Sequence, residues 1–173
     1  YEEKFYAVGK IKGSRFMKRE GKPPDESILT GRLIDRAIRP CFDQRIRRDI
    51  QVIGTVLSYD QENDTDVLSL IAASLALHIS DIPFNGPVAG LRLGQSDNNF
   101  VLNPLNSERQ KSAFDILVAS QGEKINMLEI KAQETKEETL LEAIAFGQPE
   151  LQKIIDWQNE IQKIVGLPKT ELR

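Results

Sequence analysis

Cysteine and histidine are almost missing from this chain. Its 173 residues include one cysteine, Cys41, and one histidine, His78. A single cysteine excludes an internal disulfide and any multi-cysteine metal site, and we expect Cys41 to be a packing residue. A lone histidine near the end of a helical pattern is more typical of a surface or capping residue than of a base or ligand. Hydrolase triads, zinc sites and histidine acid–base pairs are therefore excluded, which leaves carboxylates, lysines, arginines and a divalent metal for any chemistry.

Long apolar runs are missing as well. No segment approaches the roughly 18 apolar residues of a membrane span, and the chain has no basic-apolar-small leader. We expect a soluble, cytoplasmic protein without membrane contacts. A length of 173 residues with 40% hydrophobic content suits one domain. Because the chain opens on Tyr1 rather than on Met, we expect that N-terminal strands of the domain are missing from it.

Charge is divided unevenly along the chain. The formal net charge is −3, but residues 1–49 contain thirteen Lys/Arg and eight Asp/Glu, whereas residues 50–173 contain ten and eighteen. The first segment is therefore the candidate surface for a polyanion.

Hydrophobic spacing and Gly/Pro punctuation predict a series of short elements. A helix is expected from Asp25 until Pro40 stops it, a buried strand and turn over 49–66, and a central helix over 66–80. Four strand-like runs follow at 87–94, 98–104, 113–120 and 124–132. Two helices should close the chain, one from Thr135 to about Phe146 with a Thr135–Glu138 capping box, and one over 149–165. Strands grouped apart from helices predict an α+β domain.

A basic loop over 13–24 is the first candidate for a functional site, because turn residues at both ends enclose cations and soft apolar side chains. Phosphate-neutralising charge beside surface that a nucleobase can cover is what a single-strand grip needs. A short basic loop can equally be a solvated turn. The residues concerned are Arg15, Phe16, Met17, Lys18, Arg19 and Lys22.

Three arginines on the first predicted helix form the second candidate. Arg32, Arg36 and Arg39 are spaced to lie on one face, and their guanidinium groups are forks suited to phosphate. They would repel one another unless an anion lay against them. The alternative is that Asp35, Asp43 and neighbouring carboxylates pair with them, and the spacing alone does not separate the two interpretations.

Several long segments resemble the first core half of bacterial polynucleotide phosphorylase (polyribonucleotide nucleotidyltransferase). The segments are YEEKFYAVGKIKGSRFMKREGKP, LTGRLIDRAIRPCF, DIPFNGPVAGLRLG and MLEIKAQETKEETLLEAIAFG, and the match runs from Tyr1 to about Gly166. The resemblance implies a ribonuclease PH-like domain over 1–166, with the ribosomal protein S5 domain 2-like architecture of a mixed sheet packed with helices. Residues 167–173 would begin a linker toward a helical domain.

The resemblance also implies a function. Members of this family carry two such halves per chain and form homotrimeric rings around a channel for single-stranded RNA. They act as 3′-5′ exoribonucleases that degrade RNA with inorganic phosphate, releasing nucleoside diphosphates in mRNA turnover. Mg²⁺ is expected in the second half of the full-length enzyme, and no cofactor is expected in this segment.

The resemblance also implies which residues of this chain contact RNA, by matching the family's motifs to this sequence. The family's aromatic and basic constriction loop matches Phe16, Met17, Lys18 and Arg19. One aromatic has become Met and one Arg has become Lys, so stacking and forked phosphate contact should be weaker. The helix segment RLIDRAIRPCF places the three arginines near the RNA path or the interface between halves, with Ala37 and Cys41 as departures from the family pattern.

The resemblance further implies that this half is not catalytic. In the active half, a serine-rich helix N-terminus binds phosphate. The matching positions here are Asp64, Thr65 and Asp66, whose carboxylates should cap the helix and repel a phosphate dianion.

The active half also uses two aspartates six residues apart, with a lysine two residues after the second. The matching positions are Arg109, Asp115 and Leu117, so only one aspartate is kept. We expect Asp115 to be structural. The metal site and the proton donor should both be missing.

Two other functions are weighed beside the leading one. A free-standing RNA-binding scaffold subunit of an exosome-like ring would have a reading frame that ends near Arg173. An independent ribonuclease PH-type enzyme is disfavoured by the replaced phosphate and metal residues. The full-length protein is expected to be an enzyme, and this segment alone is expected to be inactive.

Overall fold

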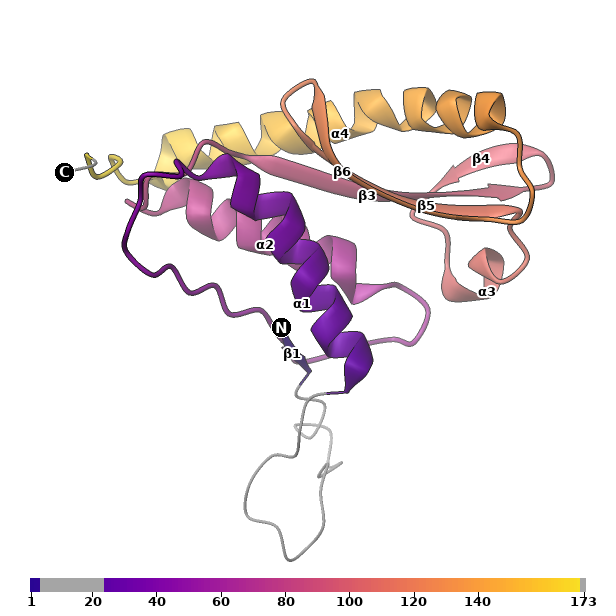
Figure 1. The fold of residues 1–173 in the computed structure, drawn as a ribbon, viewed down its shortest axis with the longest axis horizontal. Helices are drawn as coiled ribbons and strands as arrows, with labels where there is room; N and C mark the ends of the chain where they lie inside the picture. The colour runs from indigo at the N-terminus through magenta and orange to yellow at the C-terminus, as the bar shows by residue number, and fades with distance from the viewer. Residues whose placement is uncertain (4–23, 172–173) are drawn as a thin grey trace, which may run out of the picture.

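A computed structural model describes residues 1–3 and 24–171 of the chain (Figure 1). Helices and strands occupy the segments expected of an α+β domain, with strands grouped in the middle of the chain. The elements in chain order are β1 Glu2–Glu3, α1 Asp25–Ile38, the 3₁₀ turn η2 Arg39–Cys41, β2 Thr55–Val56, α2 Thr65–Ile79, β3 Val88–Ser96, β4 Asn99–Leu102, α3 Asn106–Arg109, β5 Phe114–Gln121, β6 Lys124–Ala132 and α4 Glu137–Val165.

The main sheet is antiparallel, with strand order β4-β3-β5-β6. All four strands predicted from the apolar runs are present. The β3–β4 hairpin turns through Asp97 and Asn98, whose φ angles of 48° and 63° suit the short polar side chains found there. A separate parallel pair, β1–β2, joins Glu2 to Thr55.

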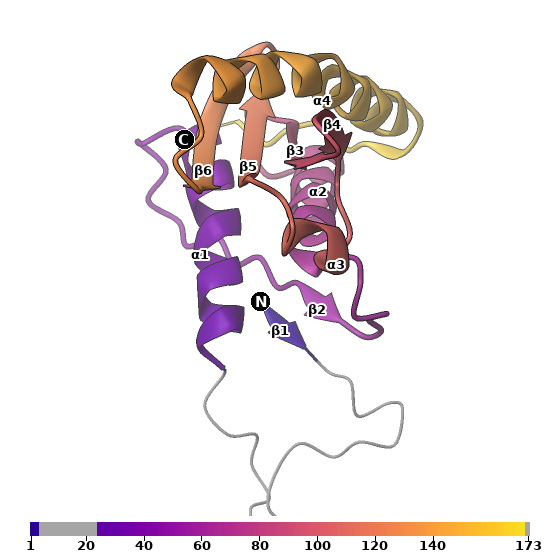
Figure 2. The same ribbon diagram turned by 90° about the vertical axis from the view of Figure 1, so that its right-hand side faces the viewer.

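Helices cover both faces of this sheet (Figure 2). Helix α4 lies on one face and α1 and α2 on the other. Each face has its own core because alternate residues of a strand point to opposite sides. In β5, Leu117 and Ala119 pack under α1 and α2, whereas Ile116 and Val118 pack against α4. The expected α+β architecture, a sheet packed with helices, is confirmed.

Helix α1 begins and ends where the sequence predicts, but its apolar stripe is only partly buried. Leu33 and Ile38 belong to the core, whereas Ile28 and Leu29 are 40% and 64% exposed. The N-terminal turns of α1 therefore expose apolar side chains, whereas the C-terminal half of the helix is packed against the core. Helical spacing alone carries no information about how far the neighbouring element reaches, so it locates this helix but not the extent of its buried face.

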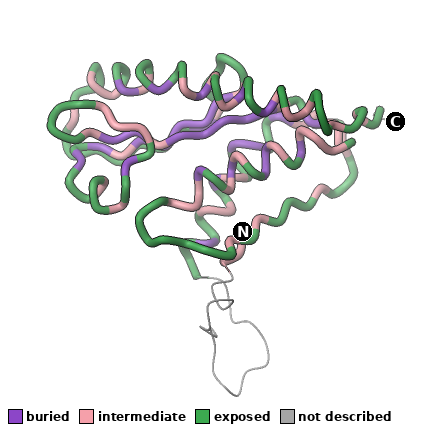
Figure 3. Tube along the Cα trace, turned by 180° about the vertical axis from the view of Figure 1, so that it is seen from behind, coloured by how far each residue is buried: buried purple, intermediate pink, exposed green. Residues whose placement is uncertain are grey.

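Residues 49–60 do not form the predicted buried strand. Only Thr55–Val56 pairs with another strand, and Ile53 and Leu57 are 65% and 62% exposed. Figure 3 shows this connection as a largely exposed track from α1 to the start of α2. Its β-branched composition favours extended backbone, but a strand is buried only when other elements lie against both of its faces. Among the described residues, β1 is the only strand that pairs with this segment, and Ile50 packs against the core.

The two predicted C-terminal helices are one helix, α4, with Pro149 inside it. Proline lacks the N–H that would bond to the carbonyl of Ala145. Both residues are exposed, so water can satisfy that carbonyl and the helix continues. The predicted capping box is also wrong, since α4 begins at Glu137 and the Thr135 hydroxyl donates to the carbonyl of Ala113 at 3.2 Å.

Cys41 and His78 both occupy structural positions. Cys41 is 1% exposed, which confirms a packing role, and burial raises the pKa of its thiol. The ring of His78 lies in the last turn of α2, with Nε2 3.1 Å from Oδ1 of Asn159 on α4. After α4, the Lys169 ammonium donates to carbonyls at the end of α2, at 2.7–3.0 Å. Within the described part of the chain, no helix is long and apolar enough to cross a membrane.

Candidate functional site

A polar cleft opens between α1, the N-terminus of α2 and the side of β3 that faces these two helices. Its volume is about 850 Å³. Carboxylates and arginines from segments far apart in the sequence meet along one wall. The residues that line it are Glu3, Glu26, Leu29, Thr30, Arg32, Leu33, Arg36, Tyr59, Asp64, Thr65, Asp66, Arg92, Asn106, Arg109 and Glu129.

Arg92 is the centre of an ion-pair cluster on this wall. Its side chain is 11% exposed, because β3 places it between the start of α2 and β5. One terminal nitrogen, Nη1, donates to both oxygens of Asp115 at 2.8 and 2.9 Å. The other, Nη2, donates to Asp66 and lies 3.4 Å from Oδ2 of Asp64. A single guanidinium therefore bridges three carboxylates.

Arg109 closes the cluster from the short helix α3. Its Nη2 lies 2.7 Å from Oδ2 of Asp115, and its Nη1 donates to Asp64 and, at 3.0 Å, to Oδ1 of Asn106. Two arginines and three aspartates thus form one continuous network. We refer to Asp64, Asp66, Arg92, Arg109 and Asp115 as the Arg–Asp cluster.

The cluster contains four of the positions that family resemblance singles out. Asp64 and Asp66 come from the α2 end, whereas Arg109 and Asp115 come from α3 and β5. Their side chains meet in one network although they come from separate elements. The expected structural role of Asp115, as a pairing residue, is confirmed by its contacts with Arg92 and Arg109.

One detail of the prediction was wrong. Asp64 is the N-cap residue of α2, but its side chain makes no capping hydrogen bond. The carboxylate reaches the arginines instead, because Arg109 approaches it from the neighbouring helix. Asp66 does bond to the helix, accepting from the backbone N–H of Val67 at 2.6 Å. The pairing with Arg109 could not be read from local spacing.

These side chains do not fit the divalent metal of an active half. Mg²⁺ needs carboxylate oxygens that are free to bind it, whereas all three carboxylates here accept from guanidinium groups. In the described ranges, no three His, Cys, Asp or Glu side chains are placed to hold a metal ion. The cluster also carries a formal charge of −1, which disfavours a phosphate dianion.

Leu117 is 2% exposed and packs in the core beneath α1 and α2. It pairs across the sheet with Arg92 on one side and with Glu129 on the other. An apolar side chain at this position supplies no proton. The position that the resemblance aligns with the active half's lysine is therefore part of the core.

The three arginines, Arg32 and Arg36 on α1 and Arg39 at its C-cap, are all exposed, but they differ in their partners. Arg36 pairs with Glu129 of β6, and Arg39 pairs with Asp35 through both carboxylate oxygens at 2.7–3.1 Å. Hydrogen bonding to Asp35 raises the pKa of Arg39. Arg32 forms no ion pair with any residue that the structure describes, and it lines the polar cleft.

Both interpretations of the arginine face therefore hold in part, because carboxylates pair with two of the three arginines. Asp43, the other carboxylate considered, pairs with Arg45 instead, which lowers the pKa of Asp43 to about 2. The predicted contacts Phe16, Met17, Lys18 and Arg19 lie outside the described residues.

Sequence reasoning missed Arg92 and Glu129. A usable signal for Arg92 was present, since it is the only charged residue in the apolar run VAGLRLG. A charge in a strand buried on both faces requires a partner of opposite sign. No comparable signal marked Glu129, because alternating charges in KINMLEIKA are also typical of a solvated edge strand.

Comparison with known proteins identifies the family of the chain. The 3′ exoribonuclease family matches in two parts, domain 1 over residues 1–83 and domain 2 over residues 86–149. The chain is 46% identical over 173 residues to a polyribonucleotide nucleotidyltransferase of Bacillus cytotoxicus and 49% identical over 172 residues to one of Thermodesulfovibrio yellowstonii. These alignments cover 100% and 99% of the chain and 24% of each relative.

A structural relative shows the same fold. The crystal structure of rice (Oryza sativa) Rrp46 superposes with a TM-score of 0.63 at 14% sequence identity, covering 83% of this chain and 68% of that one. Matches to both domains of one family span most of the chain, and the long sequence alignments place it in the first ribonuclease PH-like half of the related enzymes. The chain therefore belongs to the 3′ exoribonuclease family, and it corresponds to the ribonuclease PH-like part of the longer relatives it matches.

Proposed function

We propose that this chain is the RNA-holding, non-catalytic half of a phosphorolytic 3′-5′ exoribonuclease. The observation that carries the proposal is the Arg–Asp cluster. Its two guanidinium groups are the only cations in the cluster, and both are already engaged by carboxylates. A phosphate ion entering there would have to displace these ion pairs, and no group is left to bind a metal or donate a proton.

RNA holding is supported by the difference between Arg32 and its neighbours. An exposed arginine without an ion pair in the described chain can contact phosphate at no cost in broken salt bridges. Arg36 and Arg39 would first have to leave Glu129 and Asp35. Arg32 is thus the strongest of the three as an RNA contact, and the basic loop of Phe16, Met17, Lys18 and Arg19 would supply the rest.

The activity belongs to the longer protein that relatives of this kind represent, since the chain spans about a quarter of their length. In that protein, a second half would bind Mg²⁺ and inorganic phosphate and release nucleoside diphosphates from the 3′ end of RNA. Three copies would form a ring around the strand, in the cytoplasm and in mRNA turnover. The role of the present chain would be to guide the strand.

A paired assay of this chain and the full-length protein tests the proposal. The chain should bind a single-stranded oligonucleotide, with an affinity that falls as salt rises, and release no nucleoside diphosphate when phosphate is added. The full-length protein should do both. Robust phosphorolysis by this chain would overturn the non-catalytic role. Replacing Lys18 and Arg19 with Ala should weaken binding without altering sequence preference, and unchanged binding would remove the loop from the proposal.

A further inference from the structure

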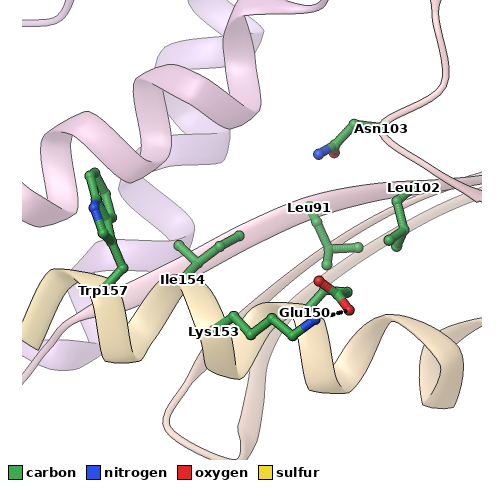
Figure 4. Close-up of a pocket in the computed structure, with 7 residues that line it drawn as sticks. All are labelled: Leu91, Leu102, Asn103, Glu150, Lys153, Ile154 and Trp157. Carbon is green, nitrogen blue, oxygen red and sulfur yellow. Dashed lines mark hydrogen bonds and ion pairs between the residues drawn. The ribbon is translucent and has the colours of Figure 1, made fainter.

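A second groove lies between α4, β3 and the end of β4 (Figure 4). Its volume is about 270 Å³. Leu91 and Arg92 are successive residues of β3, so the one side chain faces this groove and the other faces the cluster. The two sites are therefore separated by the sheet. The lining residues are Leu91, Leu102, Asn103, Glu150, Lys153, Ile154 and Trp157.

The groove exists because β4 is short. It pairs only with Leu93–Ser96, so the preceding part of β3 has no strand beside it on that edge. At Asn103, with a φ of 47°, the chain turns away from the sheet. Helix α4 continues past this point, with Glu150, Lys153, Ile154 and Trp157 on one face at i, i+3, i+4 and i+7. An open space is left between that face and Leu91.

The walls combine an aromatic ring with polar groups that have unused capacity. Trp157 is 48% exposed. Asn103 accepts the Arg92 N–H through Oδ1 at 2.9 Å, and its amide Nδ2 has no partner among the residues the structure describes. Glu150 accepts from Lys153 through Oε1 at 2.7 Å, which leaves Oε2 as an acceptor. An indole face, an amide donor and a carboxylate acceptor therefore surround an apolar floor.

We propose that this groove binds a purine base, with the base stacked on Trp157. Bases outside a duplex are held by stacking on aromatic side chains and by hydrogen bonds to their edges. A purine edge offers ring nitrogens that accept from Asn103 Nδ2 and amino or imino groups that donate to Glu150. The ammonium of Lys153 at the rim supplies charge for the phosphate that a nucleotide carries.

The size of the groove limits the ligand. Pockets for whole small molecules are typically about 300–1,000 Å³, so a space of about 270 Å³ suits one ring system with its sugar and phosphate in solvent. The base could belong to a free nucleotide or to an RNA strand. The site is independent of RNA binding at Arg32, so the two proposals can fail separately.

The chain contains a reporter for this site, because Trp157 is its only tryptophan. Titration with adenosine 5′-monophosphate should change the tryptophan emission in a saturable way, and ribose 5-phosphate should not. Uridine 5′-monophosphate should bind more weakly because its single ring covers less of the indole. Competition with a short oligoadenylate distinguishes the sources: displacement of the mononucleotide shows that the groove accepts a base within a strand. An emission change that is absent, or equal for ribose 5-phosphate, overturns the proposal.

Two variants test the contacts. Asn103→Asp keeps Oδ1 as the acceptor for the Arg92 N–H and removes the Nδ2 donor, so adenosine 5′-monophosphate should bind on the order of tenfold more weakly. Binding of adenosine 5′-monophosphate to Trp157→Ala, measured by equilibrium dialysis, should also weaken on the order of tenfold. Binding to Trp157→Phe should weaken less. Leu141→Ala, exposed on the same helix outside the groove, is the matched control. Unchanged binding by both Asn103→Asp and Trp157→Ala contradicts the assignment.

Discussion

Arg109 and Asp115 are six positions apart in the chain and form an ion pair of 2.7 Å across the junction of α3 and β5. Family resemblance aligns them with the two aspartates of an active half. Two carboxylates at these positions would repel each other unless a metal lay between them. An arginine in place of the first aspartate gives an arginine–aspartate pair that attracts instead. On that alignment the arginine would stand where a metal ligand is needed, and the ion pair it forms joins α3 to β5.

Removing Arg92 should destabilise the chain strongly. Replacement by Leu would leave three partly buried carboxylates without their shared partner, and breaking such a pair typically costs about 3–5 kcal/mol. We expect a loss of about 3 kcal/mol in the free energy of unfolding, measured by urea titration. Arg45→Ala, which removes an arginine that is 84% exposed, should change the value by less than about 1 kcal/mol. Equal effects of the two variants would show that the cluster does not stabilise the fold.

Arg32 and Arg39 form a matched pair for testing RNA contact. Both are exposed, Arg32 on α1 and Arg39 at the C-cap of that helix, but only Arg39 pairs with a neighbouring carboxylate. Arg32→Ala should weaken binding of single-stranded RNA and lower the salt-dependence slope by roughly 0.7, the value for one phosphate contact on a single strand. Arg39→Ala should have a smaller effect. Fluorescence anisotropy at several salt concentrations measures this binding. A larger loss of RNA affinity in Arg39→Ala than in Arg32→Ala would contradict the proposal.

His78 should make stability depend on pH in a narrow window. Burial lowers the pKa of His78 below its ordinary 6.5, so the unfolded chain binds the proton more readily. Its contribution to stability is complete above about pH 6.5 and is lost as pH falls toward the lowered folded pKa. Because it is the only histidine, urea midpoints measured from about pH 7.5 to 5.5 should fall in the parent chain and vary less in His78→Gln. Parallel curves for the two proteins would contradict this role.

Pro149 should weaken α4. Proline inside a helix costs about 3 kcal/mol relative to alanine, and the position is exposed. Pro149→Ala should therefore raise the free energy of unfolding by about 1–3 kcal/mol. Glu142→Ala, an exposed change on the same helix, should alter it by less than about 0.5 kcal/mol. No gain from Pro149→Ala would indicate two helices that meet at residue 149, as the sequence pattern first suggested.

Much of the fold could be predicted from local patterns. Apolar alternation and turn residues located all four strands of the main sheet, and the positions of α1 and α2 followed from helical spacing. The exposure of the connection over 49–60 was not predictable, because its composition is the same whether or not another element covers it. Pro149 wrongly predicted a break between two helices, because the local sequence does not show whether the carbonyl that it frees is exposed to water. A proline breaks a helix only where the freed carbonyl cannot reach water or another donor.

For the candidate site, the residue types were readable in the sequence and their pairing was not. Asp64, Asp66, Arg109 and Asp115 were marked by alignment with an active half, which already indicated lost phosphate and metal groups. Arg92 joins them only because β3 crosses between α2 and β5, which brings residues 26 and 23 positions away into contact. Charges at such separations interact strongly only when packing places them together away from water. Residue identity alone therefore predicted which chemistry this half would lack, and the tertiary structure decided that the side chains at these positions pair with one another.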